Sequence, residues 1–343
     1  MASLNAIARR LVEPGTGILA ADESEPTIKK RFDAIGLVST PELRRDYREM
    51  LFRSAGMKPY ISGVILTEET LQQSAADGTP FRAILGEADV VLGIKVDKGT
   101  FPMPGTDGEK ITEGLDGLRQ RLAHYARLGA GFAKWRAVIT IAENAPSKNA
   151  VRANANVLAR YAMLCQEAGI VPVVEPEVVG DGEPGTHSIE RDYDVTVETL
   201  ETVFQELRLA GLDLSGMLLK PNMVTPGIHS TQQVSVEEVA ERTVSCLKAT
   251  VPAAVPGIVF LSGGQTDYEA TAHLNAMNRM TGLPWRLTFS YGRALQNAAL
   301  HRWHGRPENV PAAQAAFTHR AEMNSLAALG RWSPALEREA AAA

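Results

Sequence analysis

The sequence has few cysteines and no long apolar run, and each absence excludes a class of protein. Its 343 residues include two cysteines, Cys165 and Cys246, far apart and without CxxC spacing, so neither a disulfide framework nor a thiolate metal site is expected. No run of about 18 apolar residues could span a bilayer. The N-terminal segment MASLNAIARR lacks the apolar core of a signal peptide. We therefore expect a soluble, cytoplasmic protein with no membrane partner.

An excess of positive charge is also missing. The chain carries 35 Lys and Arg against 40 Asp and Glu, a net charge of −5. This balance argues against a broad surface for nucleic acid but leaves room for a small basic pocket. Hydrophobic residues at 45% and charged residues at 22% exclude general disorder.

Short apolar runs alternate with helical patterns along the chain, which is typical of βα units around a parallel sheet. The clearest helical pattern covers 157–165, and the turn-rich segment 180–194 is expected to be a surface loop. No linker-like tract divides the sequence, so we expect one domain over 1–343, with a helical tail from about Pro307. Eight strands, rich in Val, Ile and Leu, are predicted at 17–21, 63–67, 90–96, 132–139, 171–178, 217–222, 257–262 and 286–291. They suggest a closed α/β barrel, the (β/α)8 TIM barrel, although a doubly wound open sheet would give the same pattern.

Charged residues stand near the C-terminal ends of strands that should be buried. Because strand side chains alternate, Lys134 and Arg136 share one face in FAKWR, as Glu175 and Glu177 do in VEPE. Four more charges lie in or after the first, third and sixth strands: Asp22, Lys95, Asp97 and Lys220. Any single one could be a structural ion pair or a side chain snorkelling at the rim. In a barrel, however, the C-terminal strand ends meet at one mouth, where such enzymes keep their active sites, so the group predicts one site.

Two glycine-bearing turns complete this rim. LSGGQ (261–265) ends the seventh strand and SYGR (290–293) ends the eighth. Glycines let backbone N–H groups approach an anion, the next helix adds its positive end, and Arg293 can bind phosphate bidentately. The loops after strands seven and eight are a recurring phosphate site in barrels. LSGGQ also matches the signature peptide of ABC-transporter ATPases, but the GxxxxGK[ST] loop of such proteins is missing.

A metal site is not predicted. His301 and His304 could share a helix face, but no third ligand lies nearby in the sequence, and two surface histidines are the simpler interpretation.

Eight motifs in fixed order, from about Arg9 to about Ser333, resemble the class I fructose-1,6-bisphosphate aldolases. They are GILAADES, GIKVDKG, FAKWR, ANANVLARYA, VPVVEPE, LLKPNMVTPG, FLSGGQ and LTFSYGRALQ. The resemblance implies a TIM barrel, a Schiff-base lysine and no metal or other cofactor. It also implies phosphorylated ketose and triose substrates in glycolysis and gluconeogenesis and, by analogy, a homotetramer.

Carried over position by position, the resemblance implies catalytic roles for five residues. In LLKPNMV, Lys220 would condense with the ketone of the substrate. In VEPE, Glu175 would be the acid-base residue beside it, with Glu177 close behind. In FAKWR, Lys134 would contact the reacting hydroxyls, and in AADES, Asp22 would lie beside the bond that breaks.

The resemblance also implies two phosphate sites. The phosphate on the aldehyde side is expected to contact Ser24, Thr27, Arg31 and Lys95, and Arg136 is expected near the reacting hydroxyls. The phosphate on the ketose side is expected to contact Ser262, Gly263, Gly264, Ser290, Gly292 and Arg293. Thr27 replaces the serine of the family and keeps the hydroxyl. The longer tail of many animal members closes with a tyrosine implicated in proton exchange. No tyrosine follows Tyr291 in this sequence, so we expect that step to run differently or more slowly.

The chemistry is intelligible from the residues alone. Cleaving the bond between carbons 3 and 4 of a ketose leaves a carbanion beside a carbonyl. Either a metal ion must stabilise that negative charge or an iminium must accept the electron pair. A lysine at a strand end favours the iminium. A transaldolase-like or deoxyribose-phosphate aldolase would share barrel and Schiff base, but two phosphate sets favour a bisphosphate. A non-catalytic scaffold on the same fold would fail an activity assay.

Overall fold

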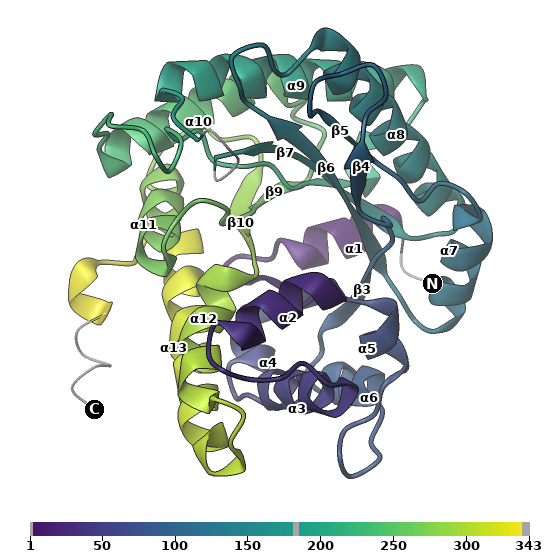
Figure 1. Ribbon diagram of the computed structural model, residues 1–343, viewed down its shortest axis with the longest axis vertical. Coiled ribbons are helices and arrows are strands. Elements are labelled where there is room, and N and C mark those ends of the chain that lie inside the picture. Colours follow the sequence, from purple (N-terminus) through teal and green to yellow (C-terminus); the bar gives the residue numbers. More distant parts are fainter. Residues whose placement is uncertain (1–2, 181–184, 338–343) are drawn as a thin grey trace.

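Eight parallel strands close into a barrel in the order β1-β10-β9-β8-β7-β6-β3-β2. The computed structural model describes residues 3–180 and 185–337. The barrel closes where β1 pairs with β10, with Ile18 opposite Ser290, so the predicted barrel is confirmed and the open sheet is excluded. Helices surround the strands (Figure 1). Across the described residues, no helix has both the length and the apolar character needed to cross a membrane.

Each predicted strand overlaps a strand of the barrel. These are β1 (Gly17–Ala20), β2 (Ile61–Leu66), β3 (Val91–Lys95), β6 (Phe132–Thr140), β7 (Val171–Val179), β8 (Leu218–Leu219), β9 (Gly257–Phe260) and β10 (Arg286–Tyr291). A hairpin that the sequence analysis did not predict, β4 (Thr100–Pro102) with β5 (Lys110–Thr112), follows β3. The helices are α1 (Leu4–Leu11), α2 (Glu25–Asp33), α3 (Pro41–Phe52), α4 (Met57–Tyr60), α5 (Glu68–Gln72), α6 (Phe81–Glu87), α7 (Leu118–Arg127), α8 (Lys148–Glu167), α9 (Ile189–Leu209), α10 (Val236–Thr250), α11 (Asp267–Asn278), α12 (Arg293–Trp303) and α13 (Val310–Ala328), with 3-10 turns η1 (Leu214–Gly216) and η2 (Pro307–Asn309).

The structure corrects two sequence predictions. The sixth strand, predicted at 217–222, is only Leu218–Leu219, because the Lys220 N–H makes the last hydrogen bond to β7 and Pro221 has no N–H to continue that ladder. The predicted loop 180–194 is helical from Ile189, because the Ser188 hydroxyl accepts the Arg191 N–H and caps α9. Residues 181–184 of that segment lie outside the described part, as do residues 338–343 of the tail.

The C-terminal segment contains a long helix. After η2, α13 runs from Val310 to Ala328 and packs against α12 and α11.

The barrel interior is apolar at one end and charged at the other. Leu11 and Val12, from the end of α1 and its C-cap, belong to the same buried apolar cluster as Phe132, Val171 and Val173 of β6 and β7. Side chains on a strand alternate, so the positions two residues further along β6 and β7 lie on the same face, nearer the C-terminal mouth. The predicted site residues occupy those positions.

Candidate active site

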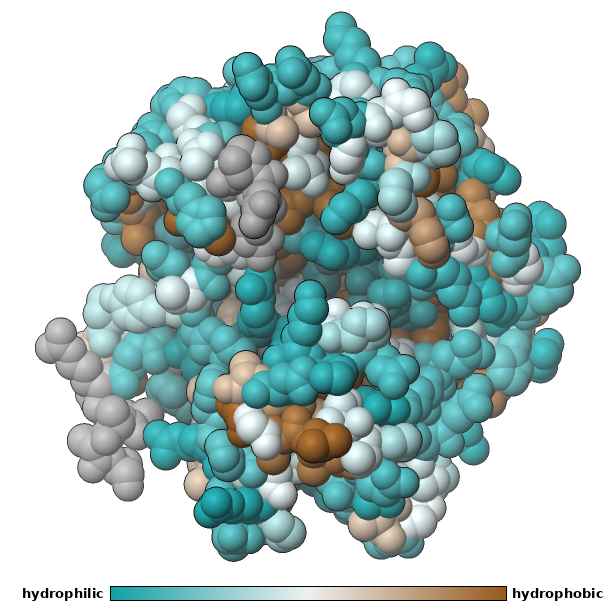
Figure 2. All heavy atoms as spheres, viewed as in Figure 1, coloured by the Kyte–Doolittle hydropathy of each residue, from teal (hydrophilic) through white to brown (hydrophobic). Residues whose placement is uncertain are grey.

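A cavity of about 1000 Å³ opens at the C-terminal end of the barrel strands. Figure 2 shows this face hollowed near its middle, between mostly hydrophilic residues. A smaller groove of about 550 Å³ lies between α7 and α8, and none of the predicted site residues lines it. Every predicted site residue except Gly264 lines the larger cavity: Asp22, Ser24, Thr27, Arg31, Lys95, Lys134, Arg136, Glu175, Glu177, Lys220, Ser262, Gly263, Ser290, Gly292 and Arg293.

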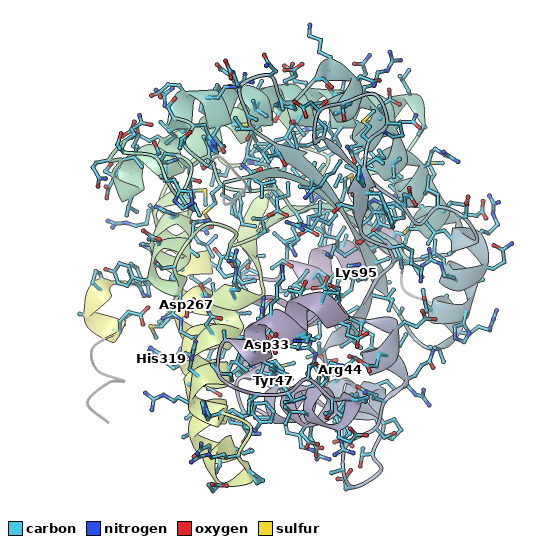
Figure 3. The ribbon with its side chains drawn as sticks, viewed as in Figure 1. Asp33, Arg44, Tyr47, Lys95, Asp267 and His319 are labelled. Atoms are coloured by element: carbon cyan, nitrogen blue, oxygen red, sulfur yellow. The ribbon has the colours of Figure 1, made fainter. Side chains whose placement is uncertain are left out.

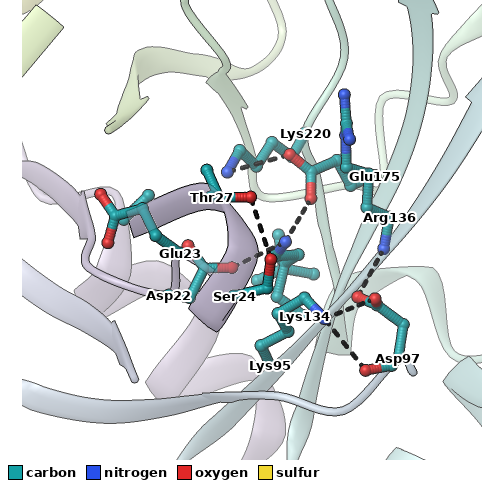
Figure 4. Close-up of polar contacts among 12 residues, drawn as sticks. Asp22, Glu23, Ser24, Thr27, Lys95, Asp97, Lys134, Arg136, Glu175 and Lys220 are labelled. Atoms are coloured by element: carbon teal, nitrogen blue, oxygen red, sulfur yellow. Dashed lines mark hydrogen bonds and ion pairs between the residues drawn. The ribbon is translucent and has the colours of Figure 1, made fainter. Parts of the chain in front are cut away.

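Two lysines and two carboxylates alternate at the centre of the cavity (Figure 4). Lys220 Nζ lies 3.0 Å from Glu175 Oε1, and Lys134 Nζ lies 3.0 Å from Glu175 Oε2. Lys134 Nζ also lies 2.8 Å from Asp22 Oδ2. These four side chains are between 4% and 11% exposed, so the charges compensate one another in a largely dry environment.

This arrangement fixes the protonation of three of the four groups. Burial alone would raise the pKa of Asp22 and of Glu175, but Lys134 and Lys220 outweigh it, and both carboxyl pKa values are lowered, that of Asp22 most strongly. Burial would lower the pKa of Lys134, yet Asp22, Glu175 and Asp97 raise it well above its ordinary value. At neutral pH the two carboxylates are therefore ionised and Lys134 is protonated.

Lys220 owes its position to the end of β8. Its backbone N–H donates to Val174 O at 2.8 Å, and Pro221 then turns the chain out of the ladder. The side chain reaches the cavity beside Glu175, an acid that can exchange a proton with it. A lysine next to a proton acceptor in a water-poor pocket is the arrangement that forms imines with carbonyl substrates.

A second group of charges lies on β6, β7 and the end of β3. Lys95 Nζ is 2.7 Å from Asp97 Oδ1, and Asp97 Oδ2 accepts the backbone N–H of Arg136. The Arg136 guanidinium in turn pairs with Glu177. The sequence places Asp97 among the charges of the barrel mouth, two residues after Lys95, but assigns it no individual role.

The start of α2 carries the residues expected on the aldehyde side. The exposed hydroxyls of Ser24 and Thr27 lie 2.9 Å apart. Arg31 Nη1 lies 2.5 Å from Glu23, which is buried and also pairs with Arg48. Burial would raise the pKa of Glu23, but the two arginines lower it. Sequence reasoning missed Glu23 and Arg48. Glu23 adjoins Asp22 in the AADES motif, whereas nothing in the sequence distinguishes Arg48 from the other charges of α3.

The two glycine turns follow β9 and β10, which are neighbours in the barrel, and β10 also pairs with β1. Gly264 has φ +74°, a left-handed conformation that favours glycine. A Cβ on Gly263 would lie 3.0 Å from Glu177 Oε1 and 3.9 Å from Arg293 Nη2, so a side chain here would press on the Glu177 carboxylate. The Ser290 hydroxyl is buried, and no hydrogen-bond partner for it is found among the described residues. An unpaired buried hydroxyl beside Arg293, at the N-terminus of α12, suits an anionic ligand.

The chain resembles known proteins along nearly its whole length. The family profile described as "Glycolytic: Fructose-bisphosphate aldolase class-I" matches residues 3–343. A probable fructose-bisphosphate aldolase class 1 of Xanthomonas campestris pv. campestris is 54% identical over 326 residues, which cover 95% of this chain and 97% of that protein. A fructose-bisphosphate aldolase of Dictyostelium discoideum is 50% identical over 333 residues, covering 96% of this chain and 92% of the relative.

A solved structure gives the same result. Fructose-bisphosphate aldolase of Plasmodium falciparum, crystallised with TRAP and a small-molecule inhibitor, superposes with a TM-score of 0.94 at 48% identity. The match covers 96% of this chain and 95% of that one. The chain belongs to the class I fructose-bisphosphate aldolase family.

Proposed function

We propose that Lys220 is the nucleophile with which this class I aldolase reversibly cleaves fructose 1,6-bisphosphate into dihydroxyacetone phosphate and glyceraldehyde 3-phosphate. The observation that carries the proposal is the contact of 3.0 Å between Lys220 Nζ and Glu175 in the barrel mouth. Lys134 also lies in this cluster, but two carboxylates hold it and raise its pKa. Lys220 is therefore the better candidate for the neutral amine that must attack the ketone.

In the first step, Glu175 accepts a proton from the Lys220 ammonium, and the free amine attacks the ketone carbon. The carbonyl oxygen takes up protons and leaves as water, and the carbon–nitrogen bond becomes an iminium. Glu175 lies within hydrogen-bond distance of Lys220 and can pass protons in both directions. Lys134, on the other carboxylate oxygen, keeps Glu175 anionic at the start of this step.

In the second step, a base removes the proton of the hydroxyl on carbon 4, and the bond between carbons 3 and 4 breaks. Its electron pair passes into the iminium, which becomes a neutral enamine, and the aldehyde product leaves. Asp22 and Lys134, 2.8 Å apart, are proposed to contact the reacting hydroxyls. The lowered pKa of Asp22 keeps it ionised and suited to hold the carbon 4 hydroxyl. Protonation of the enamine and hydrolysis of the imine then release dihydroxyacetone phosphate.

The two phosphates are proposed to bind two different sets of residues at the rim of the cavity. Ser262, Gly263, Gly264, Ser290, Gly292 and Arg293 would bind the phosphate of the ketose half, supported by the unpaired Ser290 hydroxyl. Ser24, Thr27, Arg31 and Lys95 would bind the aldehyde-side phosphate, supported by their gathering on the rim that α2 and β3 form.

Borohydride trapping tests the nucleophile. We expect dihydroxyacetone phosphate and borohydride together to fix the three-carbon unit on Lys220, located by mass spectrometry of a digest. Labelling of Lys134 or Lys95 in the unmodified chain would overturn the assignment. Fructose 1-phosphate, which lacks the second phosphate, should be cleaved more slowly than the bisphosphate. Equal rates would argue against an aldehyde-side phosphate site.

Other properties are proposed from the resemblance to the family. We propose one barrel domain over 1–343 with a helical tail from about 307, a homotetramer, cytoplasmic location and no cofactor besides the lysine imine. Light scattering tests the oligomeric state, and limited proteolysis tests the domain boundaries.

A further inference from the structure

β7 continues beyond the point where its neighbour β8 ends. The ladder between them pairs Val173 with Leu218 and Val174 with Leu219, and the Lys220 N–H adds one more bond. β7 runs on to Val179, and Glu175 and Glu177 lie on this stretch, which pairs with β6 but not with β8. The relative position of Lys220 and the two glutamates therefore needs a support other than the ladder on this side.

Beyond the end of β8, the Asn222 side chain supplies a hydrogen bond to β7. Its Oδ1 accepts the backbone N–H of Val178 at 3.1 Å, directly after Glu177. Its Nδ2 lies within hydrogen-bond distance of Met223 O at 3.1 Å and Thr196 Oγ1 at 3.2 Å. One buried amide thus joins β7, the chain just after Lys220 and helix α9.

Behind Asn222, α9 presents a buried carboxylate. Asp192 Oδ1 lies 3.3 Å from Asn222 Nδ2 and accepts the Thr196 hydroxyl at 3.2 Å. Asp192 Oδ2 lies 3.3 Å from His187 Nε2. Asp192 is only 1% exposed and belongs to the first turn of α9, where the helix dipole favours a negative charge.

The same elements join the loops after β7 and β8. Gly227 N–H donates to His187 O at 3.0 Å, and His229 N–H donates to Gly185 O at 2.8 Å. The backbones approach so closely that a Cβ on Gly227 would lie 2.2 Å from Gly185 O. Residues 185–187 and 227–229 therefore form one unit, and Asn222 connects this unit to the strand ends.

We propose that Asn222, held by Asp192, is a positioning residue that fixes Lys220 relative to the carboxylates of β7. The inference rests on the proposed role of Lys220 as the imine lysine. Neither residue lines the cavity, so each acts through the backbone and not on the substrate. A displacement of about 1 Å in a catalytic group can lower a rate about 100-fold.

The test is Asn222→Ala, measured as turnover per active site. Sites are counted by borohydride trapping to completion, so that partly unfolded protein does not lower the result. We expect turnover per trapped site to fall about 10- to 100-fold and trapping to slow. The KM for fructose 1,6-bisphosphate should change less than threefold, because the proposed phosphate-binding residues are untouched. A purely structural residue would lower thermal stability and leave turnover per trapped site unchanged.

Asp192 provides a second, independent variant pair. Asp192→Asn keeps an oxygen that can accept a hydrogen bond from Asn222, so its turnover per trapped site should stay within threefold of that of the unmodified chain. Asp192→Ala removes this oxygen and should lower turnover per trapped site. Thr199→Val is the matched control. Thr199 is equally buried on α9, one turn after Thr196. Within the described part of the chain, the Thr199 hydroxyl makes no hydrogen bond to Asn222.

The proposal would be overturned if both Asn222→Ala and Asp192→Ala kept a turnover per trapped site within twofold of that of the unmodified chain. If Lys220 is not the imine lysine, the result is distinguishable, because borohydride would then label a different lysine in the unmodified chain.

Discussion

Glu175 contacts both lysines of the barrel mouth, with Oε1 lying 3.0 Å from Lys220 Nζ and Oε2 lying 3.0 Å from Lys134 Nζ. One carboxylate thereby links the proposed nucleophile to a permanently charged neighbour. Any change at Glu175 should affect proton transfer at Lys220 more than substrate binding, because the proposed phosphate-binding residues lie at the rims of the cavity.

We predict that Glu175→Gln lowers the rate of proton exchange at the enamine carbon, because an amide cannot carry the proton. General acid–base catalysis by a positioned group contributes roughly 10²- to 10⁴-fold, and we expect a loss of that order. Tritium exchange into dihydroxyacetone phosphate measures the step. Exchange at the unmodified rate, with Lys220 still trapped by borohydride, would contradict a role for Glu175 in it.

Much of the site could be predicted from the sequence because its signals are local. Lys134 with Arg136, and Glu175 with Glu177, are charges spaced by two in apolar runs, and this spacing puts them on one strand face. The barrel brings the C-terminal strand ends together, so the charge spacing within each strand predicts a cluster of charged residues at the barrel mouth. The fold was less certain from pattern alone, because closure depends on pairing between β1 and β10, from opposite ends of the sequence.

The features that were missed depend on tertiary contacts. Arg48 on α3 pairs with Glu23 after β1, and nothing local distinguishes it from other helix charges. The turn-rich sequence GDGEPGTHS predicts a loop at the start of α9, but Ser188 is a good N-cap and the helix begins directly after it. β8 is shorter than the predicted strand 217–222 because Pro221, which has no N–H, cannot extend the ladder to β7.

We predict that Arg293→Ala weakens binding of fructose 1,6-bisphosphate and of dihydroxyacetone phosphate. A charge-assisted hydrogen bond contributes roughly 1.5–3 kcal/mol, or about 10- to 150-fold in affinity. Glyceraldehyde 3-phosphate should be affected much less. Calorimetric titration of each ligand is the measurement, and Arg302→Ala, an exposed arginine on the same helix, is the control. Equal losses for both triose phosphates would mean that Arg293 is structural.

We predict that turnover persists in EDTA. The reason is chemical: an iminium on Lys220 would accept the electron pair of the broken bond, so no divalent ion is needed to stabilise the carbanion. Steady-state cleavage of fructose 1,6-bisphosphate with and without chelator is the measurement. Loss of activity that zinc restores would contradict the proposed mechanism.

The last prediction concerns Glu337, which lies outside the proposed active site. Its carboxylate accepts from Arg320 Nη1 at 2.7 Å and from Trp332 Nε1 at 3.1 Å, and lies 3.1 Å from His319 Nε2. Arg320 is buried and also donates to Thr271. Figure 3 places His319 on the side of the molecule that α11 and α13 form. Glu337 does not line the cavity, so its contribution should be to stability alone.

We expect Glu337→Gln to lower the free energy of unfolding by about 1–3 kcal/mol, because a buried guanidinium loses its charged partner, and to leave kcat unchanged. Burial opposes ionisation of Glu337, but Arg320, His319 and Trp332 lower its pKa. A lowered folded-state pKa stabilises the protein above the ordinary glutamate pKa, and this contribution is lost as pH falls through the lowered value. The free energy of unfolding measured in urea should therefore be lower for the variant than for the unmodified chain at pH 7. The two values should converge in acid. Glu308→Gln, an exposed change in η2, is the control. A fall in kcat with unchanged stability would instead connect this segment to catalysis.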